Sequence, residues 1–152
     1  MRIIAAMVAV FGMAAAAHAA DEPRWIGNEI EKGASLIYGI PQSGYGASSF
    51  SCERKGEALR FSFAHAPIEA RTGVKVAVLL SSNNIEISVP TVGQRLEMDD
   101  LFVLEGRIRL DQKLRQLLTS SGILEVWVED GSAEFPLSGA REAARPLLER
   151  CG

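Results

Sequence analysis

Two cysteines constrain how this chain folds more than any other feature. Cys52 lies in an early apolar segment and Cys151 is the last residue but one. An even, low cysteine count in an exported chain is typical of a disulfide, which would tie the chain end to an early strand. Closing a loop of about 100 residues stabilises a fold by roughly 4–5 kcal/mol in the chain-entropy model. A metal site needs more ligands than two thiols and His65 provide, so we expect no metal.

Export itself is predicted by the first 20 residues. Arg2 precedes an uncharged apolar run over residues 3–17, which ends in Ala17-His18-Ala19, the small-x-small pattern that signal peptidase recognises. We predict cleavage after Ala19 or Ala20 and a periplasmic protein. The alternative is a membrane anchor, but the run is shorter than the about 20 apolar residues that a bilayer requires.

Composition limits the size of the fold and the class of partner. Removing 20 of the 152 residues leaves 132, enough for a single domain over residues 21–152. The formal net charge of −3 becomes −4 without Arg2. This mildly acidic balance argues against nucleic acid and against an anionic membrane surface as partners. No second apolar run could serve as an integral membrane segment.

Apolar and polar residues alternate over most of the chain, which is typical of half-buried strands. Residues 74–80 and 85–89 alternate clearly on either side of a Ser- and Asn-rich turn and predict a hairpin. Asp130-Gly131 predicts a second hairpin between residues 123–129 and 133–137. Further strands are expected at residues 34–40, 49–53, 59–63 and 101–110.

Two segments have helical spacing. Asp111 is the predicted N-cap of a Leu-rich helix over residues 112–119. A second helix should begin after Ser138, its expected N-cap, carry Cys151 on one continuous apolar stripe, and kink at Pro146. The predicted fold is therefore mainly β: an antiparallel β-sandwich or flattened barrel with a short internal helix and a disulfide-anchored C-terminal helix.

Signals for catalysis are weak. His65 is the one histidine after the leader, and it stands at a strand end where we expect a surface position or a backbone partner. Asp99 with Asp100, and Glu129 with Asp130, are adjacent residues whose side chains would point to opposite faces of a strand. We therefore expect no catalytic residues, no cofactor and no enzyme activity.

Four residues are candidate contacts for a partner or ligand. Tyr45 stands between glycines in a loop, where it is either an exposed contact or, as we expect, folded back over the core. Trp127 shares a strand face with two glutamates and is either exposed or, as we expect, covered by a helix. Arg107 and Arg109 form the polar face of one strand, which is compatible with an anion site but is expected to be a solvated face.

The last third of the chain carries a resemblance to known families. Residues 133–140 (AEFPLSGA) and 144–152 (ARPLLERCG) resemble the C-terminal end of the type VI secretion accessory family TagO/VasI. They are similar, more loosely, to the end of the invasion-associated locus B family of small periplasmic proteins. The matched positions are apolar, small or capping residues and the closing cysteine. The resemblance implies a small exported β-sandwich that works by binding, and it carries over no functional site.

These observations favour a non-enzymatic periplasmic binding or accessory protein that contacts another protein of the bacterial envelope. Two alternatives remain open. One is a module that binds a small ligand or glycan in a cleft lined by aromatic residues. The other is an inhibitor of an envelope hydrolase.

Overall fold

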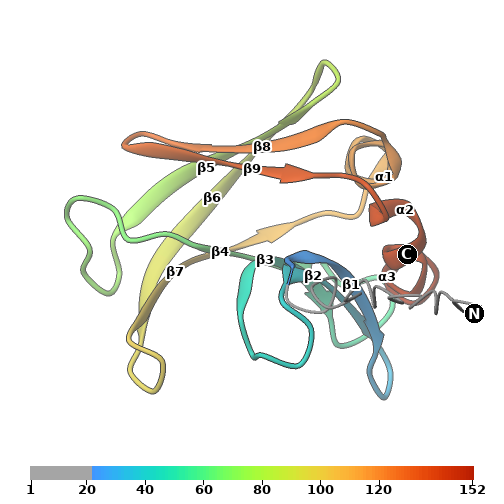
Figure 1. The fold of residues 1–152 in the computed structure, drawn as a ribbon, viewed down its shortest axis with the longest axis horizontal. Helices are drawn as coiled ribbons and strands as arrows, with labels where there is room; N and C mark the ends of the chain where they lie inside the picture. The colour runs from blue at the N-terminus through green and yellow to red at the C-terminus, as the bar shows by residue number, and fades with distance from the viewer. Residues whose placement is uncertain (1–21) are drawn as a thin grey trace, which may run out of the picture.

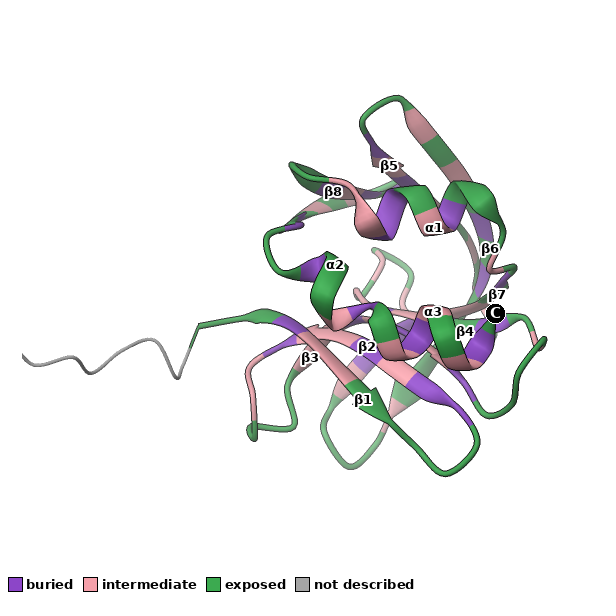
Figure 2. Ribbon diagram, turned by 90° about the vertical axis from the view of Figure 1, so that its right-hand side faces the viewer, coloured by how far each residue is buried: buried purple, intermediate pink, exposed green. Residues whose placement is uncertain are grey.

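A computed structural model describes residues 22–152, so the predicted leader and its cleavage sites lie outside the described residues. Nine strands form one antiparallel sheet in the order β1-β2-β3-β4-β7-β6-β5-β8-β9. The sheet curls into a half-barrel with the helices gathered at one end (Figures 1 and 2), which confirms the predicted fold class. The strands are β1 (Arg24–Glu29), β2 (Ala34–Gly39), β3 (Gly46–Cys52), β4 (Leu59–Ala64), β5 (Lys75–Ser82), β6 (Ile85–Leu96), β7 (Leu101–Ile108), β8 (Ile123–Val128) and β9 (Gly131–Pro136).

The concave face of the sheet holds the core. Leu36, Phe50 and Phe61 lie directly opposite one another on β2, β3 and β4, and all three are fully buried. The intervening residues, such as Ser49 and Ser62, point to the convex face. The alternation in the sequence therefore predicted the buried faces of β3 and β4 correctly, whereas it assigned no face to β2.

Trp25 joins the two edges of the sheet. Its indole Nε1 donates a hydrogen bond to the carbonyl oxygen of Pro136 at 2.8 Å, so β1 contacts the end of β9. The ring also packs against Tyr38 and Phe135, with centroid distances of 5.2 and 6.4 Å. The sequence pattern does not predict β1, because its apolar residues Trp25 and Ile26 are adjacent and do not alternate with polar ones. The two edges of the half-barrel are thus joined at this end by side chains, and no backbone ladder links them in the part of the chain that the structure describes.

The internal helix forms as predicted. α1 (Gln112–Thr119) begins after Asp111, whose Oδ1 accepts a hydrogen bond from the Leu114 N–H at 3.0 Å. The side chains of Leu114, Leu117 and Leu118 are fully buried. The cap satisfies one of the free N–H groups of the first turn, and the three leucines fix the helix against the core.

The C-terminal helix differs from the prediction in two ways. It is divided into α2 (Ala140–Ala143) and α3 (Arg145–Cys151), so Pro146 lies in the first turn of a new helix instead of kinking a continuous one. A proline is tolerated there because N–H groups of the first turn have no intrahelical acceptor. The N-cap of α2 is Gly139 with φ of 77°, and Ser138 does not cap it.

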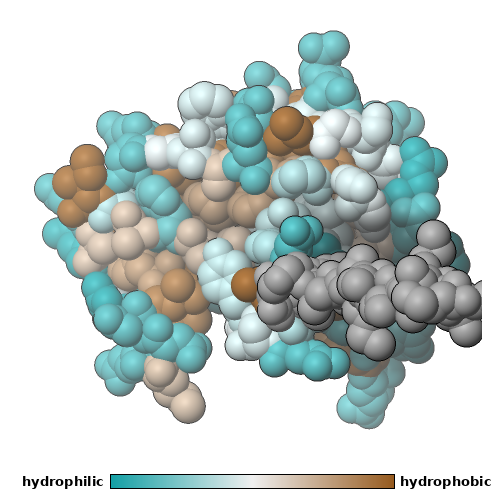
Figure 3. All heavy atoms as spheres, in the orientation of Figure 1, coloured by the Kyte–Doolittle hydropathy of each residue, from teal (hydrophilic) through white to brown (hydrophobic). Residues whose placement is uncertain are grey.

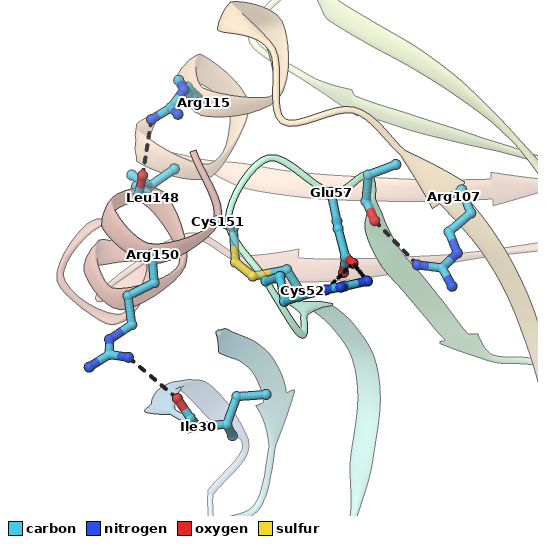
Figure 4. The surroundings of a disulfide bond; sticks show 10 residues. Ile30, Cys52, Glu57, Arg107, Arg115, Leu148, Arg150 and Cys151 are labelled. Carbon is cyan, nitrogen blue, oxygen red and sulfur yellow. Dashed lines mark hydrogen bonds and ion pairs between the residues drawn. A yellow bond between two sulfur atoms is a disulfide. The ribbon is translucent and has the colours of Figure 1, made fainter. Parts of the chain in front are cut away.

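A disulfide joins Cys52 of β3 to Cys151 of α3, as predicted, with the two Cα atoms 5.9 Å apart. The β3–β4 turn is also fixed to the end of α3, because the N–H of Gly56 donates to the carbonyl oxygen of Cys151 at 2.9 Å. Figure 4 shows the bond between the helix end and the strand. α3 packs against β1, β2 and β3. No helix within residues 22–152 is both long and apolar enough to cross a membrane.

Candidate functional site

A groove of about 730 Å³ lies on the convex face of the sheet. One wall is the β2–β3 loop, which carries Tyr45, and the other is the β6–β7 turn, which includes Asp99. Both loops project from the same side of the sheet, the lower side in Figure 1. The groove is open to solvent, and two separate hairpins form its rims.

Three aliphatic side chains line the floor between these walls. Ile26 of β1 and Ile37 of β2 lie opposite each other and are half-buried, and Val103 of β7 is buried. Polar side chains surround them, including Asn28, Ser49 and Ser62. This floor was not predicted from the sequence. The signal for it is the run Leu36-Ile37-Tyr38, which places apolar residues on both faces of one strand.

The loop that carries Tyr45 is held by a network of short hydrogen bonds. The Ser43 hydroxyl donates to the carbonyl oxygen of Ile40 at 2.7 Å and accepts from the N–H of Tyr45 at 3.0 Å. The Ile40 N–H donates back to the carbonyl oxygen of Tyr45 at 3.2 Å. Gly39 sits so close to that carbonyl that a Cβ would collide with it. The position of Tyr45 is therefore fixed by backbone geometry.

Tyr45 is exposed over half of its surface, 50 %, and lines the groove, so it does not fold back over the core. Across the groove, Met98 at the tip of the β6–β7 turn is 98 % exposed. Figure 3 shows other apolar side chains gathered on the part of the surface that lies away from the helices. An exposed tyrosine thus lines the groove, and an exposed methionine lies next to Asp99 in the turn that forms the opposite wall.

Trp127 lies elsewhere on the molecule. It is 47 % exposed on β8, so the expectation that a helix covers it is wrong. Its Nε1 donates to the Glu125 carboxylate at 2.9 Å, and Leu79 lies opposite it on β5. Four strands separate β8 from β3 in the sheet, so Tyr45 and Trp127 do not form one surface.

The two arginines lie on and beside β7. Arg107 is exposed and donates from Nη1 to the carbonyl oxygen of Ala58 at 3.3 Å. Arg109 is exposed just beyond the end of the strand. Neither residue lines the Tyr45 groove, although Arg107 shares its convex face.

The chain matches no protein-family model, no curated protein and no solved structure. The arrangement of the site must therefore be interpreted from its own chemistry. Within residues 22–152, no group of His, Cys, Asp and Glu side chains is arranged to hold a metal ion.

His65 has an acidic partner that the sequence did not reveal. Its Nε2 lies 2.9 Å from Oδ1 of Asp130, and its ring stacks on Phe63 with an interplanar angle of 4°. Oδ2 of Asp130 accepts from the N–H of Ile68 at 2.6 Å. The two residues are 65 positions apart, so only the strand order brings them together.

This histidine–aspartate pair connects the β4–β5 loop to the β8–β9 turn. The turn comprises Glu129 and Asp130, since Val128 pairs with Gly131, and so it lies one residue earlier than predicted. Within the described residues, the His65 ring makes no hydrogen bond to a serine, threonine or cysteine. Both carboxylate oxygens of Asp130 bind the loop, which gives the pair a positioning role in the fold.

We expect Asp130→Asn to lower the thermal unfolding midpoint, and the deficit to shrink at low pH. The hydrogen bond with His65, and then that from the Ile68 N–H, lower the pKa of the Asp130 carboxyl below its ordinary value of 3.8. Such a carboxyl stabilises the fold fully above pH 3.8, and this contribution is lost as the pH falls through the lowered pKa. Thermal unfolding of both proteins across this range checks the prediction, and a deficit that does not vary with pH contradicts it.

Proposed function

We propose that this chain is a non-enzymatic periplasmic protein that binds another protein of the bacterial envelope through the Tyr45 groove. One observation carries the proposal: Tyr45 is exposed on one wall of a groove with an apolar floor, and the turn that forms the other wall carries the exposed Met98 next to the lining residue Asp99. Tyrosine and methionine are enriched in the buried centres of protein interfaces. Both residues can bury apolar area on a partner without any movement of the sheet.

The groove is better suited to a loop or extended segment of a partner, which can enter it, than to a flat partner surface. Its two walls are hairpin loops, so an inserted side chain would contact Tyr45, Asp99 and the floor residue Ile37 together. Because the Tyr45 loop is already held by hydrogen bonds, binding costs little ordering entropy. Preorganised aromatic residues beside a pocket commonly act as the anchors of an interface.

Placement in the periplasm is supported by two independent features. The predicted leader directs export, and the Cys52–Cys151 disulfide is the kind of cross-link that persists in oxidising compartments. Binding is also the mode of action that the resemblance of residues 133–152 to small exported families implies.

Replacing Tyr45 with alanine is expected to weaken capture of the partner by about 30-fold or more, which is typical of an aromatic anchor. Stability should change by no more than about 0.5 kcal/mol, because the side chain is half exposed. The measurement is a pull-down from an envelope extract with the oxidised wild-type protein and the Tyr45→Ala variant, matched in thermal midpoint.

Trp127→Ala provides the matched control, since Trp127 is almost equally exposed but lies on β8. This variant should capture the partner as well as the wild type does. Tyr45→Phe should also retain most of the binding, because it preserves the ring. Equal capture by Tyr45→Ala and the wild type would show that the groove is not the binding surface. A loss of capture confined to Trp127→Ala would show that the partner binds at β8 instead.

A glycan or small ligand is the second candidate, and the polar lining of the same groove favours it. Asn28, Gln42 and Ser62 offer donors and acceptors near an exposed aromatic ring, as sugar-binding clefts do. Titration with envelope oligosaccharides separates the two candidates. Amide shifts confined to the β2–β3 loop and the floor would support the glycan, particularly if the pull-down captures no protein.

A further inference from the structure

Two arginines on the convex face are placed opposite each other by the register of the sheet. Arg60 of β4 pairs with Arg107 of β7, and Ser51 of β3 lies on the other side of Arg60. Both arginine side chains are exposed and belong to the same face. Like charges directly opposite each other on neighbouring strands destabilise a sheet. The pair is therefore an energetic cost unless something negative lies between the two side chains.

No carboxylate of the described chain neutralises these two guanidinium groups. The ion pairs found within residues 22–152 do not include Arg60 or Arg107. Glu57, which lies nearby, is bound to Arg54 at 2.7 Å. Glu105 lies two residues before Arg107 on the same face, but it makes no ion pair within 4.0 Å. The hydrogen bond from Arg107 to the neutral Ala58 carbonyl leaves its positive charge uncompensated.

A second hollow of about 730 Å³ lies beside this arginine pair. Ser51, Arg60 and Arg107 line it together with Arg54 and with the two acidic residues Glu53 and Glu57 of the β3–β4 turn. Cys52 also lines the hollow, so the disulfide to α3 holds its rim (Figure 4). The hollow is thus an open depression with one wall anchored at Cys52 by the disulfide, and it shares no lining residue with the Tyr45 groove.

We infer that Arg60 and Arg107, assisted by the Ser51 hydroxyl, bind an oxyanion in this hollow: a carboxylate, phosphate or sulfate group of a ligand. This site goes beyond the proposed function and does not depend on Tyr45. Guanidinium groups bind such anions through charge-assisted hydrogen bonds, frequently two at a time. Because both side chains are exposed, the affinity for an isolated ion is expected to be weak, with a dissociation constant of about 1 mM.

The test is a backbone-amide NMR titration of the oxidised protein with sodium sulfate, sodium phosphate or sodium acetate, against sodium chloride at equal ionic strength. The amides of Ser51, Arg60 and Arg107 should shift with a saturable dependence on the oxyanion and not on chloride. Comparison of acetate with sulfate and phosphate distinguishes a carboxylate site from a site for tetrahedral anions.

Arg60→Gln and Arg107→Gln should each abolish the saturable shifts, while Arg71→Gln, in the exposed β4–β5 loop, should leave them unchanged. Without added oxyanion, Arg60→Gln should raise the thermal midpoint by about 1–4 °C, since it relieves the repulsion. Sulfate should then stabilise the wild type more than this variant. Shifts that chloride reproduces, or that persist in both arginine variants, would overturn the inference, as would a complete lack of saturable shifts.

Discussion

Replacing Cys151 with serine is expected to lower the free energy of unfolding by roughly 2–5 kcal/mol, the range for loss of a native disulfide in a small secreted domain. The loop that this bond closes spans 99 residues, most of the described chain. The bond also fixes α3 against β3, and the carbonyl of Cys151 holds the β3–β4 turn through Gly56. Its loss therefore stabilises the unfolded chain relative to the folded one and loosens the end of the sheet.

Urea unfolding with and without a reducing agent measures this effect. The reductant should destabilise the wild type by the same amount as the mutation, and it should have no effect on Cys151→Ser. The double variant Cys52→Ser, Cys151→Ser should be no less stable than either single variant, because one bond is lost in all three. A wild type whose stability does not respond to the reductant would contradict the prediction.

Trp25→Ala is expected to cost about 3–5 kcal/mol, the range for truncating a large buried aromatic residue. Only 5 % of the Trp25 surface is exposed, and the ring packs between Tyr38 and Phe135. Its hydrogen bond to Pro136 and its contact with Phe135 both tie β1 to the end of β9. Truncation would leave a cavity and separate the two edges of the sheet.

Trp25→Phe separates the contribution of aromatic packing in the core from that of the hydrogen bond to Pro136. It keeps an aromatic ring in the core but removes the indole donor, which leaves the Pro136 carbonyl without this partner. We expect it to cost about 1–3 kcal/mol, clearly less than Trp25→Ala. Chemical denaturation of the three proteins provides the comparison. Equal stability of Trp25→Ala and the wild type would show that Trp25 does not hold the two edges of the sheet together.

Local patterns predicted much of this fold because the relevant interactions are local. The Asp111 cap, the β5–β6 hairpin and the buried face of β3 follow from neighbouring residues, and the structure contains all three. The cysteine pairing was predictable because the sequence contains only two cysteines. The break between α2 and α3 falls at Ala144, just before Pro146, and the apolar stripe does not indicate it because the stripe continues across both helices.

Contacts between residues far apart in the sequence could not be predicted in the same way. Pro90 lies inside β6, where a proline normally argues against a central strand. The structure accommodates it because pairing of β6 with β7 begins at Thr91, one residue later. The Tyr45 groove, the Arg60–Arg107 pair and the His65–Asp130 contact likewise depend on the strand order, which alternation does not determine.

Site-specific photo-crosslinking in living cells tests the central claim most directly. A crosslinking amino acid at Asp99, on the wall of the groove, should form one product with an envelope protein. The product should disappear when Tyr45→Ala is introduced, and it should be absent when the crosslinker replaces Glu86, an exposed residue at the far end of β6. No product at Asp99, or the same product at both positions, would contradict the proposal that the Tyr45 groove is the binding surface.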